Sequence, residues 1–424
     1  MPLYIPIAWY GTIDIENLKF LYQHRLVQRL RWLSQLSEKC MEYPSCTQNR
    51  LTHSLRVYND TKYAVNRPEI SDELSPKIKK ALPAVALIHD TPHSPCSHTL
   101  EPFFGHHENI NSEIVANFQS AVERAGIDFS IFRDILTKKN SAHKIISDKN
   151  FGTDKLDYLK YDTHYSGFGG IPDFANIKNS LSFINGEMAA CIDAIEDVKE
   201  LQKKYILAYR NLYCSPIGMA WQRVTQKIAH ACLESGDFTI EELRWKTDFE
   251  FWGQAALSWN HEARKLYEAT KNGICPAPIM EMLVDHHLRF RENAREVKSF
   301  SCDSGFFSYL QKWRTMENTL AFEKEAAEML GLEPWQIIFA AQDYEFRFIP
   351  TDCAIYNAAG EIFSLFGLEP EHHASLFIIG QKSLFVRISI LEKSNEELSR
   401  AKKSASALRD LLDEKLKESE EAKK

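Results

Sequence analysis

Apolar residues recur at helical spacing along much of the chain. In residues 25–39, four leucines repeat every three or four positions opposite basic residues, which is the pattern of an amphipathic helix. Similar patterns occupy Ser54–Asn66, Ile78–Ile88, Asn109–Glu123, Met188–Gln202, Trp221–Leu233 and Asp248–Ala269. Prolines and glycines separate these segments, as expected for turns between helices. The sequence therefore predicts a mainly α fold.

The composition is that of a globular protein with a sizeable core. Of the 424 residues, 44% are hydrophobic and 26% are charged, and the formal net charge of −7 gives no sign of a nucleic-acid partner. No apolar run reaches the roughly 18 residues that a membrane helix requires, and the N-terminus lacks the pattern of a signal peptide. The nine cysteines form no CxxC pair. We therefore expect a cytoplasmic protein with reduced thiols and no membrane partner.

The character of the sequence changes near Tyr344. Short apolar runs follow, and the two runs on either side of Gly380 indicate a β-hairpin. From Glu392 onward, 18 of 33 residues are charged, which favours a solvated helical tail over a short coiled coil. We therefore expect a helical core at 1–340, a small α+β lobe at 341–390 and a charged helical tail at 391–424.

Histidines and acids gather in the first quarter of the chain. Six of the 15 histidines lie between His53 and His107, and the densest stretch is HDTPHSPCSH at residues 89–98. Imidazole and carboxylate together suit a divalent metal such as Mn, Fe, Ni or Zn, and the carboxylate also admits Mg. The apolar run AVALI at 84–88 suits a buried helix that ends at this stretch, where Pro92 favours a turn. For an isolated HD dipeptide, the alternative is a pair of ordinary surface or capping residues.

Four motifs in a fixed order extend this stretch. They are R-x-x-H at 50–53, ALIHD at 86–90, PHSPCSH at 92–98 and DKLDYLKYDTHYSG at 154–167. With these motifs the chain resembles the HD-domain metal-dependent phosphohydrolases, and among them the dGTPase-like branch of deoxynucleoside-triphosphate triphosphohydrolases. Segments 28–36 and 43–50 also look like that branch. The resemblance covers about residues 25–170 and implies an HD-domain helical core, to which the residue patterns add the small α+β lobe and the charged C-terminal helix.

The resemblance also implies a catalytic centre with one divalent metal ion, either Mn, Fe, Ni, Zn or Mg. Position by position, the metal ligands are His53, His89, Asp90 and Asp154. Such a set leaves coordination positions for water and a phosphate oxygen. Asp157 competes with Asp154, which is preferred as the first acid of the D-x-x-D-Y element, and the alternative for Asp154 is a helix N-cap. An additional Mg²⁺ on the triphosphate is also expected.

The same resemblance assigns the other polar residues of the motifs. The residues expected to orient water or protonate the leaving oxygen are His93, His98, Glu101 and His107, with His106 as a rival to His107. The residues expected to contact the triphosphate are Arg50, Lys155, Tyr158 and Arg210. Gln35 and Asp162 match the pair that hydrogen-bonds the sugar 3′-hydroxyl. The alternative for each is a surface ion pair or a hydrogen bond within the core.

The chain departs from the pattern of this branch at several positions. Thr91 and Pro92 replace a residue followed by glycine, and Cys96 replaces a phenylalanine. Tyr161 stands in the place of an arginine, and Arg56 stands in the place of a glycine. None of these changes removes a metal ligand, but together they keep the base preference from being carried over.

The resemblance implies hydrolysis of deoxynucleoside triphosphates (dNTPs) to deoxynucleoside and tripolyphosphate, in control of dNTP pools or in antiviral (anti-phage) defence. It also implies a homo-oligomer and admits an allosteric nucleotide. Two alternatives stay open. One is a phosphohydrolase of nucleoside monophosphates or signalling nucleotides, and the other is a nucleotide-sensing regulator with little turnover.

Overall fold

The chain divides into two compact units that interleave along the sequence. The computed structural model describes residues 3–105, 112–169, 172–284, 297–302, 304–341, 349–381, 384–391 and 394–421. Unit 1 comprises Met1–Ala208, Leu243–Phe249 and Pro350–Leu376, and unit 2 comprises Tyr209–Glu242, Glu250–Ile349 and Phe377–Lys424. The expected mainly helical fold with small sheets is confirmed. The boundaries expected near residues 340 and 390 stay a prediction.

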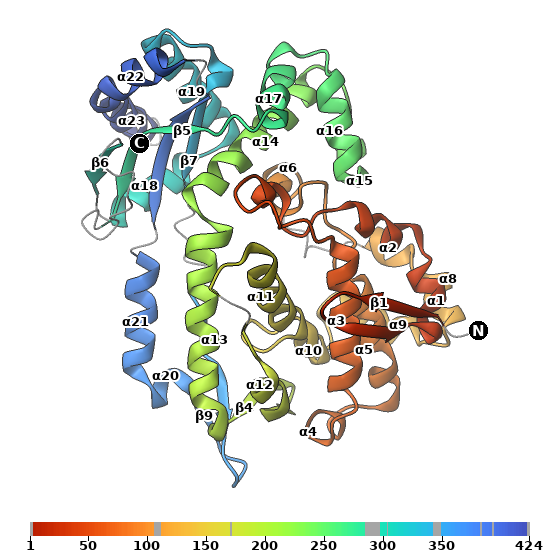
Figure 1. Ribbon diagram of the computed structural model, residues 1–424. Helices are drawn as coiled ribbons and strands as arrows, with labels where there is room; N and C mark the ends of the chain where they lie inside the picture. Colours follow the sequence, from red (N-terminus) through yellow and green to blue (C-terminus); the bar gives the residue numbers. More distant parts are fainter. Residues whose placement is uncertain are drawn as a thin grey trace. The chain divides into compact units, whose positions relative to one another are not determined.

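Unit 1 carries the histidine and aspartate motifs in and beside its helices, many of which Figure 1 labels. Its helices are α1 (Lys19–Tyr22), α2 (Arg25–Arg29), α3 (Arg50–Ala64), α4 (Pro68–Ser71), α5 (Pro76–Ile88), α6 (Glu101–Phe104), α7 (Ser112–Ala116), α8 (Gln119–Arg124), α9 (Phe129–Leu136), α10 (Lys144–Ser147), α11 (Thr153–Ser166), α12 (Ala175–Ser180), α13 (Ile195–Ala208) and α20 (Leu365–Leu368). Its strands are β1 (Tyr4–Ile7), β2 (Gly11–Asp14), β3 (Leu181–Ile184), β4 (Glu187–Cys191), β8 (Ala354–Tyr356) and β9 (Ile362–Ser364).

Helix α3 packs against both α5 and α11, and these three helices position the motif residues. The side chain of Asn49 caps the start of α3, and Ser75 caps α5, which has Pro76 in its first turn. Residues 81–88 of α5 are all buried, which confirms the helix expected there. Helix α11 ends at Gly167, whose φ of +69° closes the helix in a left-handed conformation.

The helix expected over residues 25–39 is shorter than predicted. Helix α2 ends after five residues and a 3-10 turn follows. The chain then pairs with the segment ahead of α3. There the backbone N–H of Gln35 donates to the backbone carbonyl of Gln48 at 2.9 Å, and the backbone N–H of Arg50 donates to that of Leu33 at 3.0 Å. This pairing overrides the local helical pattern and brings two predicted site residues, Gln35 and Arg50, side by side.

A late segment of the chain completes unit 1. Its sheet has the order β3-β4-β8-β9, in which β4 and β8 pair in parallel and the other pairs are antiparallel. The carbonyl of Thr351 accepts hydrogen bonds from the side-chain amides of Asn150 and Gln202, each at 3.1 Å. The Gln202 Oε1 atom lies 2.9 Å from His372 Nε2. These bonds fasten the segment to the chain ahead of α11 and to α13.

Two segments differ in type from the prediction. The first residues of the helix expected at 188–202 belong to β4, and α13 begins only at Ile195. The first half of the hairpin expected near residue 380 is helical, because α21 spans Pro370–Gln381, and only β10 (Phe385–Ile390) is a strand. Short apolar runs fit either type of element, so their tertiary partners decide.

Unit 2 is built on a four-stranded sheet of order β6-β5-β10-β7. Strand β10 pairs antiparallel with β5 and β7, and β5 pairs parallel with β6. Its elements are α14 (Pro216–Glu234), α17 (His261–Lys271), β5 (Ala277–Leu283), β6 (Lys298–Ser301), α18 (Ser304–Trp313), α19 (Met316–Leu330), β7 (Ile337–Ala341), α22 (Asn395–Lys403) and α23 (Ala405–Glu421). Helices α15 (Ile240–Trp245) and α16 (Asp248–Leu257) belong partly to unit 1 and partly to unit 2. No helix among the described residues combines the length and apolar content that a membrane crossing needs.

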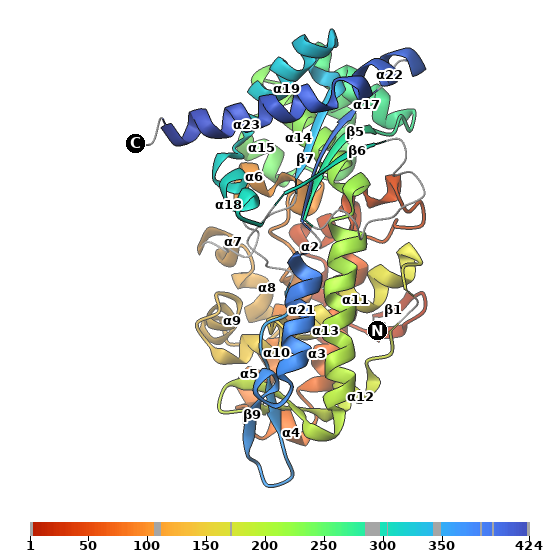
Figure 2. The ribbon, with the colours of Figure 1, turned by 90° about the vertical axis from the view of Figure 1, so that its left-hand side faces the viewer.

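The charged C-terminal segment is helical, as expected, but it is not a purely solvated tail. Its apolar residues Ala401, Ala405, Leu408 and Leu412 are buried in the core of unit 2. Helix α23 packs against β5, α18 and α19 (Figure 2). The three- and four-residue spacing places these side chains on one face of the two helices, so one apolar stripe is enough to dock a segment rich in charge.

A buried ion cluster ties α14 to α19 in unit 2. The guanidinium of Arg223 donates to both carboxylate oxygens of Glu323, at 2.9 and 2.7 Å, and Lys227 Nζ lies 3.3 Å from the same carboxylate. All three side chains are buried. Burial raises the pKa of Glu323, but the Arg223 and Lys227 cations more than offset it, so this pKa lies below its ordinary value.

We predict that Glu323→Gln lowers the free energy of unfolding at neutral pH by about 3–5 kcal/mol, because it leaves two buried cations without their counter-charge. A carboxyl whose pKa is lowered by folding stabilises the protein above its unfolded pKa, and that contribution is lost as the pH falls. The difference between wild type and variant should therefore shrink in acid. Urea denaturation at several pH values measures it, with Glu328→Gln, at an exposed position of the same helix, as control. Equal stabilities at neutral pH would contradict this account.

Candidate active site

Three helix ends bring the four predicted metal ligands together in unit 1. His53 lies in the first turns of α3, His89 and Asp90 follow the last residue of α5, and Asp154 lies in the first turn of α11. The approach to α11 requires glycine, because a Cβ at Gly152 would lie only 2.4 Å from the Ile146 carbonyl oxygen. The local sequence therefore sets the positions of the helix ends that carry the ligand residues.

Both imidazoles direct Nε2 at the same two carboxylates. His53 Nε2 lies 3.0 Å from Asp154 Oδ1 and 3.7 Å from Asp90 Oδ2. His89 Nε2 lies 3.4 Å from Asp90 Oδ1 and 3.7 Å from Asp154 Oδ1. Two nitrogens and two carboxylates that converge in this way form a ligand set for a borderline divalent cation.

Hydrogen bonds on the far side of each ring orient the two imidazoles. Nδ1 of His89 lies 2.8 Å from the Ala86 carbonyl oxygen, so this nitrogen carries the proton and donates it. Nδ1 of His53 lies 2.7 Å from Asp157 Oδ2. Such partners are typical of metal-binding histidines, because they hold the lone pair of Nε2 toward the metal. Among the described residues, the buried Nε2 of His89 has no hydrogen-bond partner, which fits a metal ligand.

Asp154 and Asp157 have separate places in this geometry. Asp154 faces Nε2 of both histidines, whereas Asp157 faces Nδ1 of His53 and accepts two hydrogen bonds from Arg56, at 2.8 and 2.9 Å. The N-cap of α11 is Gly152, so Asp154 is not the capping residue. The geometry favours Asp154 as the ligand and Asp157 as the carboxylate that orients His53.

The charges around Asp90 keep this buried carboxyl ionised. Burial raises the pKa of Asp90, but Arg50 and the neighbouring histidines lower it well below its usual range. Burial also opposes the charged form of His53, yet the carboxylates of Asp154 and Asp157 raise its pKa to about 10. Anionic oxygens thus face the imidazoles and attract positive charge to the point where the four side chains meet.

His93, His98 and Glu101 extend from Asp90 to the surface. His93 is buried and places Nε2 3.4 Å from Asp90 Oδ1. The His93 and His98 rings are 4.8 Å apart, and Nδ1 of the exposed His98 lies 3.1 Å from Glu101 Oε1. The three side chains form a second group that could hold a metal ion. Their imidazole and carboxyl groups are also suited to proton transfer. His107 and its rival His106 lie outside the described residues.

The loop that carries His93 is held by residues outside the motifs. Arg29 donates to the His93 carbonyl at 2.7 Å, and Asp248 accepts the Cys96 amide at 2.8 Å. Cys96 and Ser97 both have a φ of 52°, a backbone conformation that is uncommon for residues other than glycine. Arg29 lies in segment 28–36, which resembles the family, but the sequence gave no sign of these bonds of Arg29 and Asp248, because each residue is distant from the loop along the chain.

The predicted triphosphate contacts differ in how they are placed. Arg50 is buried and donates to Asp90 Oδ2 at 2.8 Å and to Ser97 Oγ at 2.7 Å, so it supports the cluster directly. Lys155 donates to the Lys149 carbonyl and lies 3.3 Å from the centre of the Tyr205 ring. Burial lowers the pKa of Lys155 to about 7.

The other two predicted triphosphate contacts are Tyr158 and Arg210, which belong to different units. Tyr158 is half-buried on α11, one turn beyond Asp154. Arg210 belongs to unit 2, in the π-helical turn Tyr209–Tyr213.

The predicted sugar contacts lie beside a third polar residue. Asp162 accepts a hydrogen bond from Gln48 Nε2 at 2.6 Å, and the Gln48 carbonyl accepts the Gln35 amide at 2.9 Å. The buried Oε1 atom of Gln35 has no hydrogen-bond partner within the described part of the chain. An orphaned buried acceptor of this kind is suited to a hydroxyl donor from a ligand or a water molecule. Gln48 lies in the segment that resembles the family, but its spacing gave no sign of this bond.

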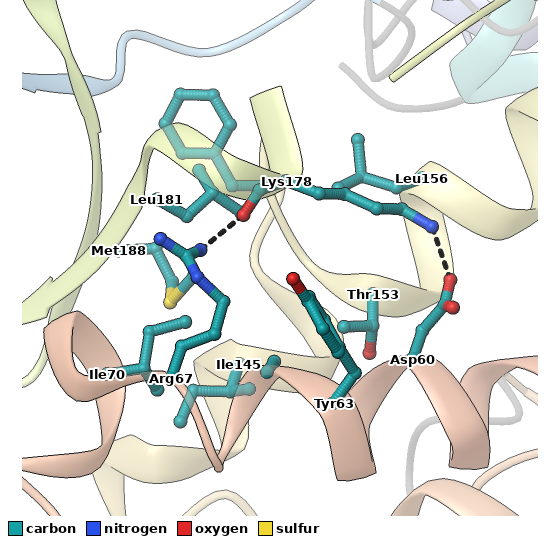
Figure 3. A pocket seen from close by; sticks show the side chains of 12 residues that line it. Asp60, Tyr63, Arg67, Ile70, Ile145, Thr153, Leu156, Lys178, Leu181 and Met188 are labelled. Carbon is teal, nitrogen blue, oxygen red and sulfur yellow. Dashed lines mark hydrogen bonds and ion pairs between the residues drawn. The ribbon is translucent and has the colours of Figure 1, made fainter. Parts of the chain in front are cut away.

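A small cavity beside α3 and α11 is distinct from the ligand cluster (Figure 3). Its volume is about 30 Å³, and side chains such as Ile70, Leu156 and Met188 make much of its lining apolar. Lys178 pairs with Asp60 at its edge. A space of this size holds roughly one or two water molecules, so it is not a nucleotide site.

Known proteins resemble the chain in sequence over part of its length, although no family model matches it. An HD domain-containing protein of Acanthamoeba polyphaga mimivirus is 26% identical over 238 residues, which are 48% of this chain and 52% of the relative. A deoxynucleoside triphosphate triphosphohydrolase SAMHD1 homolog of Dictyostelium discoideum is 23% identical over 236 residues, 50% of this chain and 45% of the relative. The chain thus spans about half the length of these relatives.

The fold is also found in solved structures. A phosphohydrolase from Bacteroides thetaiotaomicron matches with a TM-score of 0.66 and 15% identity, over 92% of this chain and 100% of the other. A hypothetical protein from Aquifex aeolicus matches with a TM-score of 0.67 and 16% identity, over 97% of this chain and 100% of the other. At such identity the likeness establishes the fold alone. The chain is thus similar in sequence to an HD domain-containing protein and in fold to a phosphohydrolase, and its His/Asp cluster is a candidate metal site.

Proposed function

We propose that this chain is a metal-dependent phosphohydrolase that converts dNTPs to deoxynucleoside and tripolyphosphate. The observation that carries the proposal is the convergence of His53, His89, Asp90 and Asp154, with both Nε2 atoms turned to the carboxylates. The triphosphate substrate is supported by the motif order and by the name of the Dictyostelium discoideum relative. The sugar specificity is supported by the orphaned acceptor of Gln35 near Asp162 and Gln48.

The four ligand residues would hold the divalent ion, which would supply Lewis acidity toward the phosphate and the attacking water. The chain's own residues then bind and orient the substrate. Arg50 keeps Asp90 ionised beside the phosphate, and Lys155 gains charge as an anionic phosphate approaches, because its pKa of about 7 leaves it only partly protonated at neutral pH. Positioning and charge neutralisation supply most of the acceleration in phosphoryl transfer.

The leaving group defines what the histidines must do. Attack in line at the α-phosphorus expels the 5′-oxygen of the nucleoside, and an alkoxide is a poor leaving group unless an acid protonates it. We assign proton transfer near Asp90 to His93 and His98, whose rings lie 4.8 Å apart, with Glu101 as the carboxylate partner of His98. We assign the acid to His107, with His106 as its rival.

The wider biological context follows from the proposed activity. A role in dNTP-pool control or anti-phage defence, a homo-oligomeric state and an allosteric nucleotide are the expectations that accompany it. Release of orthophosphate from nucleoside monophosphates, or turnover of signalling nucleotides, would instead identify a related hydrolase. Binding of dNTP with Mn²⁺ and without product would identify a nucleotide-sensing regulator.

We predict that Asp154→Asn loses bound metal and activity while the protein stays folded. Asp154 is the most exposed of the four ligands, with 31% of its side chain accessible, so its replacement disturbs the core least. Metal content by mass spectrometry, activity with Mn²⁺ after chelation, and circular dichroism measure the three properties. Asp134→Asn on the surface of α9 is the matched control. If the protein keeps wild-type turnover after chelation, the assignment of the metal site is wrong.

We predict that 2′,3′-dideoxynucleoside triphosphates are poor substrates. Without the 3′-hydroxyl, the buried Oε1 atom of Gln35 is left without a donor beside Asp162, which costs roughly 1–3 kcal/mol, or about ten- to a hundred-fold in kcat/KM. Gln35→Leu should remove most of this discrimination, while Gln119→Leu on the surface of α8 should preserve it. The ratio of kcat/KM for matched deoxy and dideoxy substrates is the measurement. A ratio near one in the wild type would exclude both residues from the sugar site.

We predict that hydrolysis in ¹⁸O-labelled water puts the label in tripolyphosphate and leaves the nucleoside 5′-oxygen unlabelled. Attack at the α-phosphorus with loss of the 5′-oxygen requires this outcome. Mass spectrometry of both products measures it. Label in a nucleoside monophosphate would rule out triphosphohydrolysis and leave the metal site standing. His107→Ala should lose turnover and still bind dNTP, and loss in His106→Ala alone would move the acid to that residue.

A further inference from the structure

Two positions where the chain departs from the family pattern touch each other in unit 1. Arg56 stands in place of a glycine on α3, and Tyr161 stands in place of an arginine on α11. The Arg56 guanidinium carbon lies 3.8 Å from the centre of the Tyr161 ring. Both side chains are buried. The two departures are therefore parts of one arrangement rather than independent changes.

Arg56 clamps the carboxylate that orients a metal ligand. Its Nε donates to Asp157 Oδ1 at 2.8 Å and its Nη2 donates to Asp157 Oδ2 at 2.9 Å, a bidentate pair with no solvent access. Asp157 Oδ2 in turn lies 2.7 Å from His53 Nδ1. A carboxylate held at both oxygens has one orientation, so the guanidinium sets the direction of the His53 ring through Asp157.

The same guanidinium also reaches toward the predicted sugar contacts. Arg56 Nη2 lies 3.3 Å from Gln48 Oε1, and Gln48 Nε2 donates to Asp162 Oδ1 at 2.6 Å. A continuous set of buried hydrogen bonds thus joins His53 to Asp162 through Arg56.

Helix geometry explains how the two departures compensate. Positions 157 and 161 are one turn apart on α11, so an arginine at 161 lies within reach of Asp157 from the same helix. In this chain Tyr161 fills that place, and the cation comes across from α3. A glycine at position 56 would leave the room that an arginine from 161 needs.

We propose that Arg56 is the positioning residue of the metal site in this chain. It takes the role that an arginine at position 161 would otherwise have. Arg56 holds Asp157, and Asp157 in turn holds His53. Arg56 also links these two residues to Gln48 and Asp162. The link to the sugar contacts rests on the proposed function. The effect on the metal rests only on the ligand cluster.

The test compares metal affinity in single and exchanged variants of the full chain, by titration with Mn²⁺ in the absence of nucleotide. Arg56→Lys keeps the charge but loses the planar fork, and Arg56→Gly removes both. Each should weaken Mn²⁺ binding by about 10- to 100-fold, as loss of an outer-shell partner does. Adding Tyr161→Arg to Arg56→Gly should recover most of the affinity, while Tyr161→Arg alone should not improve on the wild type.

The control separates loss of positioning from loss of stability. Arg223→Lys breaks a buried bidentate pair in unit 2, and should lower the melting temperature with Mn²⁺ affinity unchanged. Wild-type affinity in Arg56→Lys, or an exchanged variant no better than Arg56→Gly, would overturn the proposal. Because no nucleotide is present, failure of dNTP hydrolysis leaves this outcome interpretable. If the sugar link holds, Arg56→Lys also narrows the deoxy over dideoxy preference.

Discussion

Ionised carboxylates buried among imidazoles are the constraint on which the arrangement of unit 1 depends. A buried charge is tolerated only when cations and hydrogen-bond donors surround it on every side. For Asp90 these come from α3, from the end of α5 and from the loop beyond it. The packing of α3 against α5 and α11 and the chemistry of the site are therefore satisfied by the same contacts.

The sequence was informative about which residues meet and much less about how they pair. The resemblance of the ordered motifs to a known family predicted the four residues that converge, and each of these residues lies at or near a helix end. It did not predict that Arg50 bonds Asp90 or that Asp162 bonds Gln48, since a long side chain chooses among several partners within reach. Residues such as Arg29 act on the site from distant parts of the chain, and their type alone does not mark them.

The fold was predictable where local and tertiary preferences agree. Helix α5 has a cap, a proline in its first turn and a continuous apolar run, and all three favour the same element. The region near residue 380 lacks such agreement. There α21 and β10 share a similar apolar composition, and β10 is a strand because β5 and β7 flank it. Partners so distant in sequence leave no local trace.

The interleaving of the two units bears on how the chain is made. Unit 1 lacks its outer strands β8 and β9 until residues 350–376 have left the ribosome, long after α13. The roughly 140 residues in between take about 7–28 s to translate at ordinary rates. During that time β4 presents an unpaired edge, the kind of surface that recruits other strands. Co-translational chaperone contact, and slow codons within unit 2, would therefore matter more for this chain than its modest length suggests.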